Sequence, residues 1–85
     1  MANLFCRICG FEHVEPQWGT DGRCPLYEIC PCCGAESGYE DCTALAIHSY
    51  RKAWLAKGTP WFSPKSQPAN WNVVRQLENI PPEFR

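Results

Sequence analysis

The sequence EICPCCGAESGYED, residues 28–41, places three cysteines in four positions, Cys30, Cys32 and Cys33. A tetrahedral metal site takes two ligands from a turn this tight. A glycine directly after the second ligand lets the chain leave the turn in a conformation that a side chain disfavours, while backbone N–H groups point back toward the sulfurs. Cys33 is followed by Gly34 and Cys32 is not. We therefore predict Cys30 and Cys33 as the ligands.

The same pattern occurs earlier in the chain. Residues 6–12, CRICGFE, and residues 30–36, CPCCGAE, both read C-x-x-C-G-x-E, and we call each C-x-x-C-G turn a knuckle. Twenty residues separate Cys9 from Cys30, which is within the range of zinc sites built from two C-x-x-C pairs. The predicted ligands of one zinc ion per chain are Cys6, Cys9, Cys30 and Cys33.

The length and cysteine content of the chain limit its class. The chain has 85 residues, which is enough for one domain, 1–85, but too few to bury a large core without a staple. Its seven cysteines indicate that the staple is a set of disulfides or a metal. An oxidised scaffold usually pairs every thiol, so an odd count favours metal.

Three further features favour a cytoplasmic protein without a membrane anchor and argue against a general nucleic-acid-binding protein. The first residues lack a basic segment followed by an apolar one, so no signal peptide is predicted. No apolar run approaches the ~20 residues that a membrane-spanning helix needs. The formal net charge of −1 lacks the basic excess typical of nucleic-acid-binding proteins. In the reducing cytosol, clustered cysteines bind metal rather than form disulfides.

The residues around the knuckles are predicted to form short strands and turns. The expected strands are residues 4–5, 11–14 and 26–29. Between them, proline, glycine and an Asp21-Gly22 pair mark residues 15–23 as a loop, with Asp21-Gly22 as a hairpin tip. This layout is that of a zinc ribbon or a rubredoxin-like knuckle pair, and it defines residues 1–40 as a zinc-ribbon half.

From about residue 41 the apolar period becomes helical, which predicts a helical half, 41–85, packed on the ribbon. Asp41 or Thr43 can cap a helix that runs to about Lys57, with Gly58 as its C-terminal stop. The apolar face of this helix comprises Ala46, Ile47, Tyr50, Ala53 and Trp54.

A short second helix is predicted to begin near Asn70 or Asn72 and to end before Pro81-Pro82. Its expected apolar residues are Trp71, Val74 and Leu77. We expect a further apolar cluster of Trp54, Trp61 and Trp71. The predicted fold is thus a small metal-stapled α+β fold, in which a knuckle pair with short β-strands precedes one longer and one short α-helix.

Three cysteines lie outside the predicted site. Cys32 is expected to point away from the metal and to pack as a small buried hydrophobe. Two alternatives are a reserve or redox-sensitive thiol that pairs with Cys24 or Cys42, and a second metal site formed with these two and a histidine. His13 and His48 are expected to be surface or hydrogen-bonded residues without a chemical role.

The chain resembles a family of small bacterial cysteine-rich CPCC proteins. The resemblance rests on the two knuckles, on PLYEICPCCG at 25–34 and on GYED at 38–41. The resemblance extends through Trp54, the WFSP motif at 61–64 and Trp71, and so covers nearly the whole chain. Members of this family are mostly uncharacterised. The resemblance implies, as one specific role, an immunity protein that neutralises a secreted bacterial toxin.

Three function classes agree with these features. The favoured one is a zinc-binding protein-interaction module whose partner is a protein, as in a toxin–immunity pair. The alternatives are a rubredoxin-like electron carrier with iron in the same four thiolates, and a zinc ribbon that binds nucleic acid through Arg51, Lys52 and Lys57. An enzyme is not expected, because four thiolates close a tetrahedral site and leave no position for water or substrate.

Overall fold

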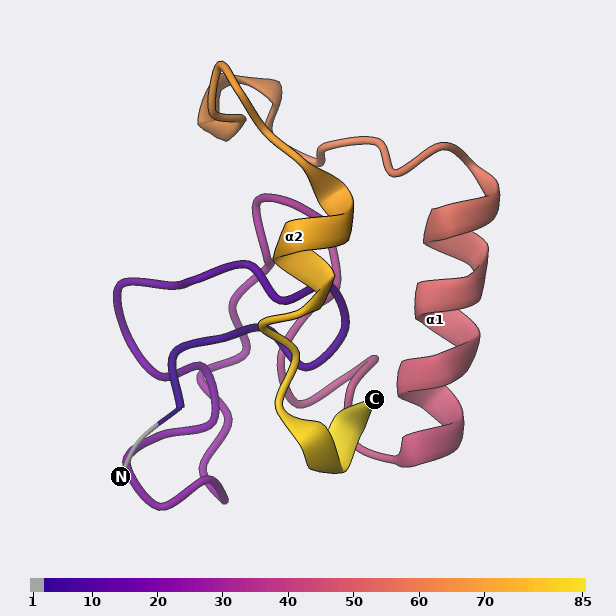
Figure 1. Ribbon diagram of the computed structural model, residues 1–85. Helices are drawn as coiled ribbons and strands as arrows, with labels where there is room; N and C mark the ends of the chain where they lie inside the picture. Colours follow the sequence, from indigo (N-terminus) through magenta and orange to yellow (C-terminus); the bar gives the residue numbers. More distant parts are fainter. Residues whose placement is uncertain (1–2) are drawn as a thin grey trace.

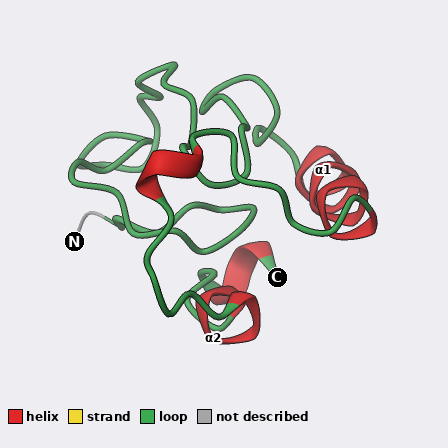
Figure 2. Ribbon diagram, turned by 90° about the horizontal axis from the view of Figure 1, so that it is seen from above, coloured by secondary structure: helices red, strands yellow, loops and turns green. Residues whose placement is uncertain are grey.

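The structure, a computed structural model, describes residues 3–85, in which loops carry the knuckles and helices pack against them (Figure 1). In chain order the elements are helix α1 (Ala44–Ala56), the 3-10 helix η1 (Pro64–Ser66), helix α2 (Val73–Leu77) and the 3-10 helix η2 (Pro82–Phe84). Figure 2 shows the residues before α1 as loops and turns, with α1 standing at one side of them. α1 is the longest helix of residues 3–85, and its 13 residues are too few to span a bilayer.

The predicted strands are not confirmed. Strand pairing within residues 3–85 is limited to two isolated antiparallel bridges, Phe5–Glu12 and Ile29–Glu36. One further backbone hydrogen bond follows each bridge, from His13 N to Leu4 O at 2.8 Å and from Ser37 N to Glu28 O at 3.0 Å. Pairing ends there: the side chain of Val14 is 97% exposed, and Tyr27 has a left-handed backbone with φ of 56°, which interrupts the extended run expected at 26–29. The backbone groups that flank the knuckles close these turns instead of extending a sheet.

The loop between the knuckles turns at Asp21-Gly22, as predicted, but it is not the tip of a hairpin. Gly22 has φ of 75°, and Asp21 Oδ1 accepts a hydrogen bond of 2.9 Å from the N–H of Arg23. The N–H of Cys24 donates to the carbonyl of Trp18 at 3.0 Å. The loop therefore folds back on itself, and Trp18 is brought beside the first knuckle.

Helix α1 has the predicted limits. Thr43, rather than Asp41, is the N-cap, since its hydroxyl oxygen accepts a hydrogen bond of 3.0 Å from the N–H of Ala46. The helix gives way to Gly58, which has φ of 89° and so continues the chain in a conformation that other residues disfavour. Ile47 and Trp54 are buried one and three turns into the helix, on the predicted face.

Helix α2 is short and is capped by Asn72, whose side-chain oxygen accepts a hydrogen bond of 3.1 Å from the N–H three residues on. Its inward residues differ from the prediction. Val73 and Leu77 pack against the core, whereas Val74 is 65% exposed. Because the helix starts at Val73, the inward face follows the i, i+4 spacing from that residue. Ala53 of α1, also predicted to face inward, is exposed.

The core joins the two halves of the chain around the cysteines. Its buried members are Cys6, Ile8, Cys9, Cys30, Cys32, Cys33, Ala35, Ile47 and Trp54. The predicted tryptophan cluster is confirmed: the rings of Trp61 and Trp71 are 5.2 Å apart and those of Trp54 and Trp71 are 6.5 Å apart, both edge to face. Such pairs add about 0.5–1.5 kcal/mol each to the area they bury.

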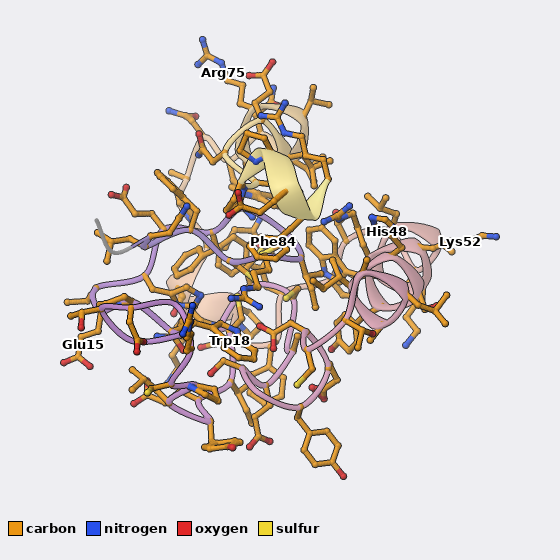
Figure 3. The ribbon with its side chains drawn as sticks, turned by 90° about the horizontal axis from the view of Figure 1, so that it is seen from below. Glu15, Trp18, His48, Lys52, Arg75 and Phe84 are labelled. Atoms are coloured by element: carbon orange, nitrogen blue, oxygen red, sulfur yellow. The ribbon has the colours of Figure 1, made fainter. Side chains whose placement is uncertain are left out.

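Arg51 of α1 ties the first knuckle to the last residues of the chain. Its guanidinium donates to the carbonyl oxygens of Ile8 at 2.6 Å, Arg7 at 2.8 Å and Phe84 at 2.7 Å. Figure 3 shows Phe84 on the inner side of α1, whereas Lys52 points away from the molecule. Arg51 is therefore a structural residue and not part of a basic helix surface.

Candidate metal centre

Four cysteine sulfurs meet between the two knuckles. Cys6, Cys9, Cys30 and Cys33 are buried, and their Sγ atoms all lie within 4.8 Å of one another. The Sγ atoms of Cys6 and Cys33 are 3.8 Å apart, and those of Cys9 and Cys30 are 3.7 Å apart. A tetrahedron with metal–sulfur distances of about 2.3 Å has sulfur–sulfur edges of about 3.8 Å. The four predicted ligands are thus brought together at a spacing that fits a metal ion.

The two knuckles have the same backbone structure. In the first knuckle the N–H of Cys6 donates to the carbonyl of Phe11 at 2.8 Å, and the N–H of Gly10 donates to the carbonyl of Cys6 at 3.0 Å. The equivalent bonds of the second knuckle join Cys30 N to Ala35 O at 2.8 Å and Gly34 N to Cys30 O at 2.9 Å. The repeated sequence pattern therefore has a repeated structure, in which each turn supplies two sulfurs.

The glycine of each knuckle is needed for two reasons. Gly10 and Gly34 have φ of 82° and 83°, a region that favours glycine. In addition, a Cβ on Gly10 would collide with the carbonyl oxygen of Gln76 in α2, and one on Gly34 would lie 3.2 Å from the ring of Phe62. The knuckle glycines thus permit both the turn and the close approach of the helical half.

Cys32 is not one of the four clustered sulfurs, as predicted. Its side chain is fully buried, and its sulfur accepts a hydrogen bond of 3.3 Å from Nε2 of Gln76. Cys24 and Cys42 are exposed. Within residues 3–85 no second group of cysteines, histidines and carboxylates is gathered closely enough to hold a metal. The predicted burial of Cys32 against the helical half is confirmed.

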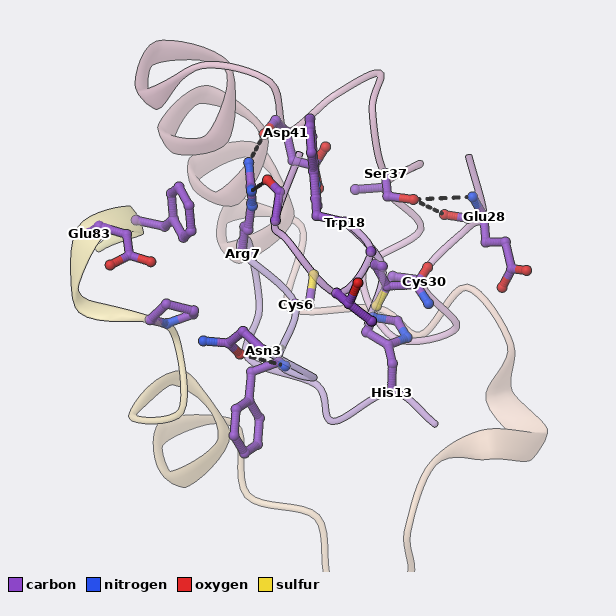
Figure 4. Close-up of a pocket in the computed structure, with 18 of the residues that line it drawn as sticks. Asn3, Cys6, Arg7, His13, Trp18, Glu28, Cys30, Ser37, Asp41 and Glu83 are labelled. Carbon is purple, nitrogen blue, oxygen red and sulfur yellow. Dashed lines mark hydrogen bonds between the residues drawn. The ribbon is translucent and has the colours of Figure 1, made fainter. Parts of the chain in front are cut away.

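His13 lies closer to the sulfurs than the sequence indicated. It is buried, it packs edge to face on Phe11 at 5.1 Å, and Figure 4 shows it beside Cys6 and Cys30. Burial lowers the pKa of His13, but hydrogen bonds with Cys30 and Cys6 raise it, and the pKa is about 9. A signal existed in the sequence: His13 directly follows the C-x-x-C-G-x-E pattern, as Ser37 does in the second knuckle.

The thiols have unequal acidities because they hydrogen-bond to one another. Bonds from Cys30 and Cys33 hold the pKa of Cys6 well below its usual range, and a bond from Cys33 lowers the pKa of Cys30 to about 6. Burial raises the pKa of Cys9, and hydrogen bonding with Cys30 raises that of Cys33. A divalent cation held by these four sulfurs would displace the protons of the thiols.

A cavity of about 630 Å³ opens beside the cluster (Figure 4). Cys6 and Cys30 line this cavity, together with His13, whereas Cys9 and Cys33 do not. The first cysteine of each knuckle thus faces the cavity. Molecules that enter this cavity therefore reach these two residues and not Cys9 or Cys33, although Cys33 is itself 6% exposed outside the cavity lining.

The far wall of the cavity is built around Arg7. Its guanidinium lies between two aromatic rings, 3.9 Å from the ring centre of Trp18 and 4.2 Å from that of Phe84. Asp41 is buried, accepts hydrogen bonds from Trp18 Nε1 at 2.9 Å and from the N–H of Gly38 at 2.8 Å, and has a pKa that burial raises. Asp41 therefore holds Trp18 in place and does not cap α1.

The chain can now be compared with known proteins. Its class is that of a small protein with a buried four-cysteine site that can hold a metal ion, and no protein-family model matches it. It is 29% identical over 79 residues to YozI of Bacillus subtilis, an uncharacterised protein, covering 74% of this chain and 65% of that protein. It is 27% identical over 96 aligned positions to YoaQ of the same organism, also uncharacterised, covering 94% of this chain and 70% of that protein. The chain spans less than two thirds of the length of YozI. No solved structure matches.

Proposed function

We propose that the protein is a protein-binding module whose fold is held together by one structural zinc ion. The observation that carries the metal site is the buried cluster of four sulfurs with the spacing of a four-thiolate centre. Four thiolates complete a tetrahedral coordination shell and leave no position for water or substrate, which supports a structural role and argues against an enzyme. The matched backbone bonds of the knuckles support a rubredoxin-like or zinc-ribbon arrangement.

Zinc is the usual occupant of a closed site made of four cysteines. Iron in the same thiolates would make a rubredoxin-like electron carrier, and the paired knuckles also favour this second candidate. Elemental analysis of purified protein separates them. We expect one zinc per chain and a colourless solution. Stoichiometric iron with a red colour would support the electron carrier, and protein that folds without metal would contradict both.

A surface beside the second knuckle supports a protein partner. We call three exposed side chains the aromatic surface: Tyr27 (62% exposed), Tyr39 (75%) and the aliphatic Ile29 (47%). The ring of Tyr27 packs on Gly38, because a Cβ added to Gly38 would lie 2.8 Å from that ring. Gly38 directly precedes Tyr39, so the two tyrosines lie close to each other. Tyrosine is enriched in protein–protein interfaces, where its ring supplies area and its hydroxyl supplies a hydrogen bond.

The charge of the chain is divided between its halves, which indicates what kind of protein would bind this surface. Residues 1–40 have six acidic and two basic side chains, whereas residues 41–85 have three acidic and six basic ones. Glu28, Glu36 and Glu40 lie next to the aromatic surface in sequence. A basic protein is therefore the complementary partner, and nucleic acid is disfavoured at this half. The resemblance to CPCC proteins implies that this basic partner is a toxin domain.

Capture experiments with the metal-loaded protein test this function. The bait is compared with two double variants that each remove two exposed apolar side chains. Ile29→Ser with Tyr39→Ser alters the aromatic surface, and Val14→Ser with Leu45→Ser alters residues elsewhere. We expect a basic protein to be captured by the wild type and the second variant but not by the first. Capture of nucleic acid, or equal capture by both variants, would contradict the proposal.

A further inference from the structure

The two sulfurs that face the cavity distinguish one side of the metal centre from the other. Cys6 and Cys30 line a cavity of about 630 Å³, and Cys6 is the most exposed of the four clustered cysteines, at 7%. Cys9 is fully buried and does not line the cavity. A small oxidant that enters through the cavity therefore meets Cys6 and Cys30 first, although Cys33 is 6% exposed and Cys30 is 2% exposed. A metal-bound or free thiolate is the form of cysteine that such an oxidant attacks.

Each of these two sulfurs has a second sulfur within reach across the site. Cys6 Sγ is 3.8 Å from Cys33 Sγ, and Cys30 Sγ is 3.7 Å from Cys9 Sγ. Both contacts join one knuckle to the other, and together they use all four cysteines once. A sulfur oxidised at the cavity would thus be met by a thiol from the opposite knuckle.

We propose that the metal centre is a site of reversible oxidation by hydroperoxides, in which attack at Cys6 and Cys30 forms the disulfides Cys6–Cys33 and Cys9–Cys30 and releases the metal ion. This inference rests on the proposed metal site. The cross-links would hold the knuckles together after the metal has left, so the protein would change its metal content without losing the contact between its halves.

The chemistry balances with two hydroperoxide molecules for each centre. The Cys6 thiolate attacks one peroxide oxygen, the O–O bond breaks, and hydroxide (or alkoxide) leaves and takes a proton from solvent, so sulfur is oxidised to a sulfenic acid while peroxide is reduced. The Cys33 thiolate then attacks that sulfur, the S–O bond breaks, and hydroxide leaves as the disulfide forms. Cys30 and Cys9 repeat these steps with the second peroxide, and the metal loses its ligands.

Cys32 has no part in this reaction. Its side chain is fully buried against Gln76, and it does not line the cavity. Cys24 and Cys42 are exposed and would react separately, so they are replaced in the test protein. The redox role considered for Cys32 on sequence grounds is thereby assigned to the cavity-facing ligands instead.

The test uses full-length Cys24→Ser/Cys42→Ser protein, whose zinc content is measured before treatment with hydrogen peroxide. Zinc release is followed with a chromogenic chelator, and disulfides are mapped by mass spectrometry without reduction. We expect one zinc released and two peroxides consumed per chain, the two disulfides named above, and recovery of zinc binding after reduction. Adding Cys32→Ala should leave the rate of zinc release unchanged.

Several results would overturn the proposal. Disulfides within a knuckle, a disulfide that contains Cys32, or slower release in the Cys32→Ala protein would show that the wrong sulfurs were assigned. Zinc retained in excess peroxide would show that the site is inert. Protein that contains no zinc before treatment would contradict the proposed function, and in that case the disulfide map alone decides whether Cys6 pairs with Cys33.

Discussion

Gly10→Ala is expected to destabilise the protein more than Gly58→Ala. Both glycines are left-handed, with φ of 82° and 89°, so alanine costs about 1–2 kcal/mol at either position. Their surroundings differ, since a Cβ on Gly58 meets nothing within 4 Å, whereas one on Gly10 collides with the carbonyl of Gln76 and lies 3.3 Å from the N of Ile80. Such overpacking costs about 1–3 kcal/mol. The expected losses are therefore about 1–2 kcal/mol for Gly58→Ala and about 2–5 kcal/mol for Gly10→Ala.

The free energy of unfolding is measured by denaturant titration with tryptophan fluorescence, at a fixed free zinc concentration because ligand binding adds to stability. In a domain of this size each kcal/mol lowers the Tm by roughly 4–8 °C. Gly34→Ala should fall between the two, since its Cβ would press on the ring of Phe62, which is 60% exposed and can move. Equal losses for Gly10→Ala and Gly58→Ala would refute the packing of α2 on the first knuckle.

Three further outcomes are expected. Cys33→Ser should abolish stoichiometric zinc binding, whereas Cys32→Ala should keep one zinc per chain and lower the free energy of unfolding by about 1 kcal/mol. Elemental analysis measures the zinc content, and zinc retained by Cys33→Ser would show that another residue is the ligand. Arg51→Met removes hydrogen bonds to three carbonyls and should lower the free energy of unfolding by about 2–4 kcal/mol, whereas its control Lys52→Met should lower it by less than about 0.5 kcal/mol. Similar losses of stability in the two variants would contradict the structural role of Arg51. Burial and the charge of Cys33 raise the pKa of Tyr50 to about 12, so the protonated phenol contributes to stability in full below its usual pKa of about 10, and this contribution is lost as the pH rises from 10 to 12. The free energy of unfolding should therefore fall less steeply over this pH range in Tyr50→Phe than in the wild type, and equal slopes would refute the raised pKa.

The clustering of the four cysteines could be predicted from the sequence because the geometry of each turn is local. Each C-x-x-C-G turn fixes two sulfurs within a few residues, and the glycine identifies which of the three cysteines at 30–33 lies at the second ligand position. The limits of α1 were predictable for the same reason, since Thr43 and Gly58 act on the first and last turns of the helix.

The features that were missed depend on residues far apart in the chain. Arg51 is bonded to carbonyls 43 and 44 positions away, so no local pattern distinguishes it from its neighbour Lys52. The inward face of α2 was predicted around Val74, because five helical residues contain too few turns to fix a phase. The strands failed because apolar content next to the knuckles does not reveal that Tyr27 interrupts the extended chain.

The paired knuckles give the centre an approximate local dyad, and the residues just outside them break that symmetry. The dyad relates Cys6 to Cys30, and it also relates the residues that directly follow the two C-x-x-C-G-x-E motifs, which are His13 and Ser37. An imidazole therefore stands on one side of the axis and a hydroxyl on the other, and both line the same cavity. Two halves with identical turns thus become chemically unequal: the hydroxyl of Ser37 accepts a hydrogen bond from the N–H of Glu28, whereas the ring of His13 lies beside Cys6 and Cys30 (Figure 4). The two sides of the cysteine cluster that face the cavity therefore differ in the chemistry of the residue beside them.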